Sequence, residues 1–161
     1  MMFYPFRIRE ICQKAKPDVK VTNPFTAAIF ALKSLEASPI ALVTPYRHDL
    51  NVQMKNYFEN EGIEVKAMIS FNEEDDNNVG RISPESIEKA ALEVGQRSEI
   101  NGVFISCTNL RFATKVEDLE KKLGKSVTSS NHAMAWHALY LAGVGLPNAG
   151  WGKLYQKTPN S

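Results

Sequence analysis

The pattern of apolar and polar positions along the chain predicts strands that alternate with helices. Strands are predicted at residues 40–43, 63–69, 102–105 and 126–129, with a brief further strand at 19–21. Helices are predicted at 8–15, 24–35, 50–61, 84–94, 116–123 and 131–142, with a short docking helix around 151–155. Strands separated by helices favour a parallel sheet covered on both faces, with right-handed crossovers. The predicted fold class is therefore α/β, a four-stranded parallel sheet in a flavodoxin-like (Rossmann-like) three-layer lobe.

Cap and turn residues mark the ends of several of these helices. Asn23 followed by Pro24 is a strong helix start, because asparagine accepts hydrogen bonds from free N–H groups and proline suits the first helical position. Gly62 is placed to end the helix over 50–61. Residues 72–78 are acidic and rich in asparagine, which predicts a loop.

Composition is that of one domain with an ordinary core. The 161 residues carry a formal net charge of +1 and are 43% hydrophobic. Lys and Glu are interspersed, which argues against nucleic acid or an anionic membrane as a partner. No apolar run approaches the roughly 20 residues of a membrane span, and the N-terminus lacks the order of a signal peptide.

Cysteine usage and the absence of nucleotide motifs limit the chemistry further. Cys12 and Cys107 show neither disulfide-type nor metal-type spacing, so we expect a cytoplasmic protein without a metal. Cys12 lies in a helical pattern and is interpreted as a packing residue. Neither G-x-G-x-x-G nor a Walker A motif occurs, so no nucleotide cofactor is expected.

The candidate functional residues lie at the carboxyl ends of the predicted strands, where open α/β sheets bind ligands. Cys107 follows the strand over 102–105, and Tyr46 follows the strand over 40–43. The loops at 72–78 and 129–131 end the other two strands. A thiol at such a strand end, facing a helix N-terminus, is favoured as thiolate. The phenol, amides, hydroxyls and thiol together predict a site for a small anionic or carbonyl substrate.

Each of these residues also has a plain structural interpretation. Cys107 is compatible with a role as one more buried small hydrophobe, since free cysteine is often buried. Tyr46 is compatible with an ordinary turn aromatic, and the asparagines with turn formers or helix caps. The coincidence of four loops at one edge is better evidence than any single residue.

Several motifs resemble those of maleate cis-trans isomerases. They are Thr22-Asn23-Pro24, I-A-L-V-T-P-Y at 40–46, E-E-D-D-N-N-V-G-R-I-S at 73–83, V-F-I-S-C-T-N-L-R at 103–111, and S-S-N-H-A at 129–133 with Trp136-His137. These isomerases belong to the aspartate/glutamate racemase superfamily, which includes arylmalonate decarboxylase and an ectoine-utilisation branch. The resemblance extends from about residue 8 to residue 154.

The resemblance implies a cofactor-independent enzyme with two similar α/β lobes and usually one cysteine from each lobe. Cys107 matches the cysteine of the C-terminal lobe and is the expected catalytic residue. Tyr46 matches a tyrosine that contacts a substrate carboxylate, and Asn78, with Asn77 as the alternative, matches a loop asparagine in the same role.

The expected activity is cis-trans isomerisation of a small dicarboxylate by a cysteine thiolate. The backbone N–H groups of Thr108 and Asn109 are expected to contact this substrate. A single-cysteine decarboxylase or racemase of the superfamily, and a non-catalytic binding module, are the alternative functions.

This sequence departs from the family in one respect. The C-T-S-G-type turn that carries the first cysteine does not occur, and the chain begins where the early strands of the N-terminal lobe should have passed. We therefore expect a shortened relative or a fragment of a longer protein. The expected parts are N-terminal helices at 1–38, the α/β lobe at 39–144 and a C-terminal extension at 145–161. Apolar helix positions that border the other lobe in the family predict a homo-oligomer with weak or absent turnover of maleate.

Overall fold

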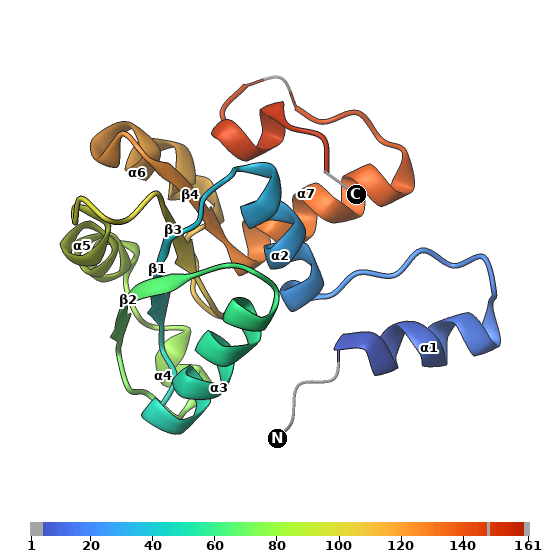
Figure 1. The fold of residues 1–161 in the computed structure, drawn as a ribbon, viewed down its shortest axis with the longest axis horizontal. Coiled ribbons are helices and arrows are strands. Elements are labelled where there is room, and N and C mark those ends of the chain that lie inside the picture. The colour runs from blue at the N-terminus through green and yellow to red at the C-terminus, as the bar shows by residue number, and fades with distance from the viewer. Residues whose placement is uncertain (1–4, 148, 160–161) are drawn as a thin grey trace.

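A parallel four-stranded sheet forms the centre of the computed structural model, which describes residues 5–147 and 149–159, with side chains from residue 8 onward. The strands are β1 (Ile40–Thr44), β2 (Val65–Ser70), β3 (Gly102–Ile105) and β4 (Ser126–Ser129). Their order is β2-β1-β3-β4, and every adjacent pair is parallel (Figure 1). The predicted fold class is confirmed.

Helices cover both faces of this sheet (Figure 1). They are α1 (Pro5–Ala15), α2 (Pro24–Ser34), α3 (His48–Asn60), α4 (Asp76–Val79), α5 (Pro84–Gly95), α6 (Val116–Leu123) and α7 (Ser130–Ala142), with short 3-10 helices η1 (Ala113–Lys115) and η2 (Lys153–Gln156). Helices α2, α3 and α7 share one apolar cluster with strand residues such as Leu42 and Phe104. Helices α5 and α6 pack against Val43 and Val103 on the opposite face. Successive strand side chains point to opposite faces, so the same strands build both clusters.

The helix starts follow the cap residues of the sequence. The Asn23 side chain accepts a hydrogen bond from the Thr26 N–H at 3.0 Å, and Pro24 begins α2. Ser83 caps α5 through the Ser86 N–H at 3.1 Å. Such a cap contributes about 1 kcal/mol, because it satisfies an N–H group that has no partner inside the helix.

Two predictions for the strands differ from the structure. The strand predicted at 19–21 is wrong: the Val19 N–H closes a turn on the Lys16 carbonyl oxygen at 3.0 Å, and these residues pair with no other strand of the described chain. Strand β2 begins at Val65 because the Ile63 N–H bonds to the Phe58 carbonyl oxygen at 2.9 Å. Ile63 thus belongs to the turn that ends α3.

Two further predictions are corrected in the loops. The acidic segment at 72–78 was predicted to be loop throughout, but its last residues form the start of α4. The Asp75 carboxylate accepts the Asn77 N–H at 2.7 Å and so caps this turn. The docking helix predicted around 151–155 is η2, which begins two residues later and is a 3-10 helix.

Helix α2, before the first strand, and η2, after the last helix, both pack into the core of the lobe. Ala28 and Leu32 of α2 are buried in the cluster that α7 and the sheet share. Leu154 and Tyr155 of η2 are buried in the same cluster. This one cluster contains residues from all three predicted parts of the chain. The predicted boundaries between these parts, at 38/39 and 144/145, stay a prediction.

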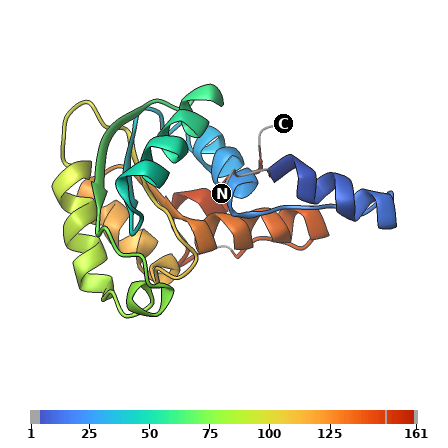
Figure 2. The same cartoon turned by 90° about the horizontal axis from the view of Figure 1, so that it is seen from below.

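Helix α1 projects from this body (Figure 2). Ile8 and Ile11 of α1 are 50% and 59% exposed, and Cys12 is half-buried. The predicted self-association stays a prediction. Across residues 5–147 and 149–159, none of the helices has the length and apolar content needed to cross a membrane.

Gly102, at the start of β3, lies where two segments come close together. A Cβ at this position would lie 2.6 Å from the Ala37 Cβ and 3.2 Å from the Ser126 carbonyl oxygen. We expect Gly102→Ala to lower the free energy of unfolding by about 1–3 kcal/mol, because the neighbours must be forced apart. Urea denaturation measures the change. Gly145→Ala is the control, since its Cβ would meet no described atom within 4 Å; an equal loss in both variants would contradict the prediction.

His132 is a buried histidine that ties α7 to the C-terminal segment. It is 1% exposed, and its Nε2 lies 2.8 Å from the Trp151 carbonyl oxygen. A carbonyl oxygen only accepts, so Nε2 carries the proton and Nδ1 accepts from the Thr128 hydroxyl at 3.0 Å. Burial lowers the pKa of His132 from 6.5 to about 4, so the ring is neutral at pH 7.

The lowered pKa of His132 predicts acid sensitivity. The unfolded chain protonates this residue below about pH 6.5, whereas the folded chain does so only near pH 4. Stability contributed by the neutral ring is therefore lost as pH falls from 6.5 to about 4, by about 3 kcal/mol in total. Urea denaturation over this pH range should show a flatter slope for His132→Gln than for the parent. His48→Gln, at an exposed position, should keep the parent slope; equal slopes in parent and His132→Gln would sink the prediction.

Candidate functional site

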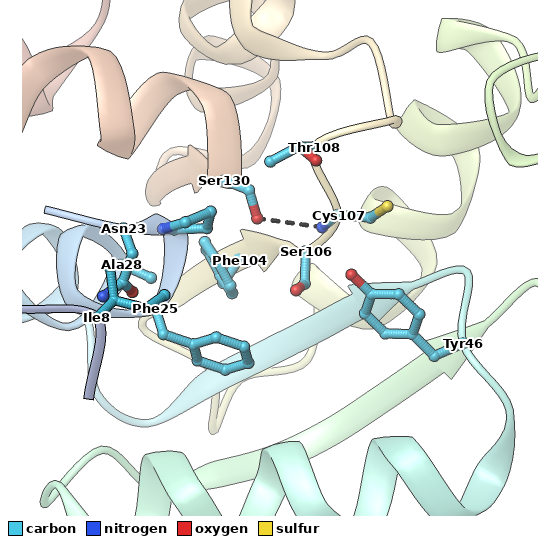
Figure 3. A pocket seen from close by; sticks show the side chains of 11 residues that line it. Ile8, Asn23, Phe25, Ala28, Tyr46, Phe104, Ser106, Cys107, Thr108 and Ser130 are labelled. Carbon is cyan, nitrogen blue, oxygen red and sulfur yellow. Dashed lines mark hydrogen bonds between the residues drawn. The ribbon is translucent and has the colours of Figure 1, made fainter. Parts of the chain in front are cut away.

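A cavity of about 230 Å³ opens at the carboxyl edge of the sheet (Figure 3). It lies beside the ends of β1 and β3, where the strand order switches direction and where open α/β sheets bind ligands. Helix α2 and the start of α7 complete its wall. The polar residues that line it are Asn23, Tyr46, Ser106, Cys107, Thr108 and Ser130.

Cys107 leaves the sheet in an unusual backbone conformation. Its φ is +123°, which L side chains rarely adopt. Strand β3 pairs with β4 as far as Ile105 opposite Ser129, where β4 ends. Beyond this pair the Cys107 N–H donates to the Ser130 hydroxyl oxygen at 3.1 Å (Figure 3). Such a conformation costs about 1–3 kcal/mol and persists only where the surrounding contacts hold it.

The thiol of Cys107 lies between the cavity and the apolar cluster of the α5–α6 face. The residue is 8% exposed, and its sulfur points away from Ser130 (Figure 3). The backbone N–H of Asn109 donates to this sulfur at 3.4 Å. An N–H donor beside the sulfur stabilises the negative charge of a thiolate.

The phenol of Tyr46 points toward the segment of Ser106 and Cys107 (Figure 3). Two side chains hold the Tyr46 backbone: its carbonyl oxygen accepts from Asn51 Nδ2 at 2.8 Å and from the Ser70 hydroxyl. Burial, and next the charge of Cys107, raises the pKa of Tyr46 well above its usual value. The phenol therefore stays protonated at neutral pH and acts as a hydrogen-bond donor.

The cavity has a polar end and an apolar end. The hydroxyls of Tyr46, Ser106 and Ser130 gather beside Cys107. The apolar lining residues are Ile8, Pro24, Phe25, Ala28 and Phe104. Because none of the described lining residues is Lys, Arg or His, an anionic ligand would be held by hydroxyl and N–H donors. The arrangement suits a carboxylate at one end and an apolar body at the other.

The structure brings three of the sequence-predicted residues together. Tyr46, Cys107 and Thr108 all line the cavity. Asn109 follows them but is exposed, and its side-chain Nδ2 donates to the Asp76 carbonyl oxygen at 3.4 Å. The Asn109 N–H donates to the sulfur of Cys107, and a substrate contact by this N–H stays a prediction.

The predicted asparagine of the acidic loop lies outside the cavity. Asn78 belongs to α4, is exposed, and accepts from an Arg81 guanidinium N–H at 3.3 Å. Asn77, the alternative, is exposed beside it. Substrate contacts by these two residues stay predictions.

Several lining residues were not identified as site residues from the sequence, among them Asn23, Phe25 and Phe104. Asn23 and Phe25 belong to the start of α2, which precedes the first strand, so chain order does not place them at the carboxyl edge. Phe104 lies inside β3, where the sequence pattern indicates a core residue. The motif Thr22-Asn23-Pro24 was the sequence feature nearest to this wall. In the described part of the chain, His, Cys, Asp and Glu side chains form no group of three that could hold a metal ion.

Known proteins similar to this chain include maleate isomerases and an arylmalonate decarboxylase. The family model described as arylmalonate decarboxylase matches residues 10–155. A maleate isomerase of Nocardia farcinica is 30% identical over 132 residues, which are 81% of this chain and 52% of that protein. An arylmalonate decarboxylase of Bordetella bronchiseptica is 24% identical over 139 residues, which are 85% of this chain and 58% of that protein.

Solved structures agree with the fold. The maleate cis-trans isomerase of Nocardia farcinica bound to TRIS matches with a TM-score of 0.85 at 26% identity, over 92% of this chain and 61% of that chain. The chain thus spans a little over half the length of the curated relatives it matches. Because the family match extends over residues 10–155, nearly the whole sequence, the chain belongs to the arylmalonate decarboxylase family.

Proposed function

We propose that the Cys107 cavity binds a small dicarboxylate of the maleate type and that the Cys107 thiolate isomerises it from cis to trans. The observation that carries the proposal is the convergence of one thiol with the hydroxyls of Tyr46 and Ser106 in a single cavity. The similarity to a maleate isomerase supports the choice of ligand.

The proposed reaction uses no cofactor. The thiolate sulfur forms a bond to one carbon of the C2=C3 double bond, and the π electrons move to the other carbon, where the adjacent carboxylate delocalises them. Rotation about the new single bond follows. Expulsion of the sulfur restores the double bond in the trans form and regenerates the thiolate, so atoms and electrons balance.

In this scheme, neutral hydrogen-bond donors stabilise the negative charges of the ligand and of the sulfur. The protonated Tyr46 phenol donates to the ligand carboxylate that takes up charge. The Thr108 N–H has no acceptor among the residues that the structure describes, and it is directed to the same carboxylate in the proposal. The Asn109 N–H stabilises the sulfur before addition and after expulsion.

The apolar wall favours a second candidate, decarboxylation of an arylmalonate. Phe25, Ala28 and Phe104 offer a surface for an aromatic or alkyl group that maleate lacks. Here the bond to one carboxylate breaks and releases CO2, the electron pair stays on the α-carbon, and the Cys107 S–H gives its proton to that carbon. Solvent then returns a proton to the thiolate.

Substrate conversion separates these two candidates. Fumarate formed from maleate, and lost in Cys107→Ser, supports isomerisation; CO2 released from phenylmalonate with the same dependence supports decarboxylation. If maleate or phenylmalonate protects Cys107 from alkylation but is not converted, the chain is a binding module.

The thiol itself should form a covalent adduct with the ligand. We expect incubation with maleate, followed by acid quench and peptide mass spectrometry, to show one added maleic acid on Cys107, because an addition intermediate is trapped when expulsion is stopped. Cys12→Ser is the matched control and should keep the adduct, whereas Cys107→Ser should lose it. An adduct at Cys12 alone, or at both cysteines to the same extent, would refute the assignment.

Tyr46→Phe should weaken ligand binding without unfolding the protein. Loss of one donor from a desolvated site costs about 1–3 kcal/mol, which raises the maleate concentration for half-protection of Cys107 by roughly 5- to 150-fold. Tyr140→Phe removes the same hydroxyl from an exposed position and is the control. Half-protection at the parent concentration in Tyr46→Phe would place the carboxylate elsewhere.

A further inference from the structure

We infer that Ser130 is a positioning residue: by accepting the Cys107 N–H it holds Cys107 at positive φ and directs its sulfur toward the Asn109 N–H. The inference rests on the proposed role of Cys107 as the reacting thiol and adds a residue that acts through it. Ser130 itself lies at the start of α7 and is 3% exposed.

Strand register explains why a side chain is needed here. The Ser106 N–H donates to the Val43 carbonyl oxygen of β1 at 2.8 Å, so the next N–H, that of Cys107, faces the β4 side. At this level β4 has ended and α7 has begun. The Ser130 hydroxyl oxygen, 3.1 Å from the Cys107 nitrogen, takes the place of the missing strand carbonyl.

The hydroxyl of Ser130 is not required to cap α7. Ser129 is the N-cap residue, and its side chain accepts the His132 N–H at 3.4 Å. Two adjacent serines thus divide two tasks: the first caps the helix, and the second holds Cys107. Removal of the second hydroxyl leaves the cap in place.

A second contact beside Ser130 holds the same turn. Asn131 Nδ2 donates to the Thr108 carbonyl oxygen at 2.8 Å, and the Leu110 N–H donates to the Cys107 carbonyl oxygen at 3.2 Å. Within this turn the Asn109 N–H reaches the sulfur at 3.4 Å. The direction of the thiol therefore depends on the φ of Cys107. Among the described residues, Ser130 alone accepts a hydrogen bond from the Cys107 N–H and so holds this φ.

Without an acceptor at position 130, the hydrogen bond that stabilises the positive φ of Cys107 is lost. A buried N–H that has lost its partner drives the backbone toward an arrangement that restores one. A return of φ to the negative region swings the Cβ–Sγ bond away from its present direction and breaks the Asn109 N–H contact. Ligand donors such as Tyr46 stay where they are, so binding should be less affected than reaction.

The test measures amide hydrogen exchange by NMR on the full chain and on Ser130→Ala, Ser130→Thr and Ser83→Ala. Ser83→Ala is the matched control, because it removes a serine hydroxyl that accepts a backbone N–H at a helix start but does not line the cavity. The exchange rates of the Cys107 and Asn109 amides are each divided by the rate of the Val43 amide in β1. We expect both ratios to be at least roughly tenfold higher in Ser130→Ala than in the parent. Ser130→Thr, which keeps a hydroxyl acceptor, should restore parent behaviour, and Ser83→Ala should leave both ratios unchanged.

Reaction with maleate supplies a second readout. Ser130→Ala should lower the maximal rate of adduct formation at Cys107 by roughly tenfold, while the half-saturating maleate concentration changes by less than roughly threefold. A purely structural loss would speed the exchange of Val43 as well and would not be rescued by threonine.

The outcomes separate this inference from the proposed function. An Asn109 amide that exchanges equally in the parent and in Ser130→Ala overturns the positioning role. If Ser130→Ala does not fold, amide exchange in the parent protein provides the test. The Cys107 and Asn109 amides should then exchange more slowly than the Thr108 amide, and equal rates overturn the inference. Faster exchange in Ser130→Ala with no maleate adduct in any variant rejects the proposed function and leaves Ser130 as the residue that orients the thiol.

Discussion

Parallel pairing of β1 with β3 determines where the candidate site of this chain lies. Val43 and Ile105 stand opposite each other at the ends of the two strands, so the residues that follow them emerge at the same level. The crossover from β1 leaves through α3 on one face, whereas the crossover into β3 arrives through α5 on the other. The chain thereby opens a crevice between two adjacent strand ends, which α2 and α7 close from the side.

The secondary structure could be predicted from the sequence because its determinants are local. Asn23 with Pro24, and Ser83 with Pro84, mark the helix starts that the structure has. Gly124 takes the left-handed conformation that ends α6 at the expected residue. The strand predicted at 19–21 failed because two alternating valines indicate strand propensity but supply no neighbouring strand.

The candidate site was predicted in part, for a reason that the strand order explains. Tyr46 and Cys107 follow the two central strands and meet in the cavity. Asn78 follows β2, which lies one strand further out, and the turn of α4 leaves its side chain beside Arg81. Sequence patterns identify the carboxyl ends of strands, but they do not give the order of the strands in the sheet.

The conformation of Cys107 was beyond prediction for a different reason. Nothing in the Ser-Cys-Thr-Asn stretch demands a positive φ, which is a preference of glycine and asparagine rather than cysteine. It arises from an acceptor 23 residues further along the chain. Phe25 likewise reaches the cavity through the packing of α2 on α7, a contact between segments far apart in sequence.

The neutral lining of the cavity has a consequence for the conditions under which a carboxylate can be held there. Sites built from Lys or Arg draw anions by long-range attraction, which dissolved electrolyte screens over a Debye length of about 10 Å at 0.1 M. Hydroxyl and amide dipoles act at contact distance, where little electrolyte intervenes. In the proposed function, the affinity of this cavity therefore depends on how well a ligand exchanges its hydration shell for the fixed donors of Tyr46, Ser106 and Thr108. Under this proposal, selection among anions rests on shape and desolvation and persists in concentrated salt.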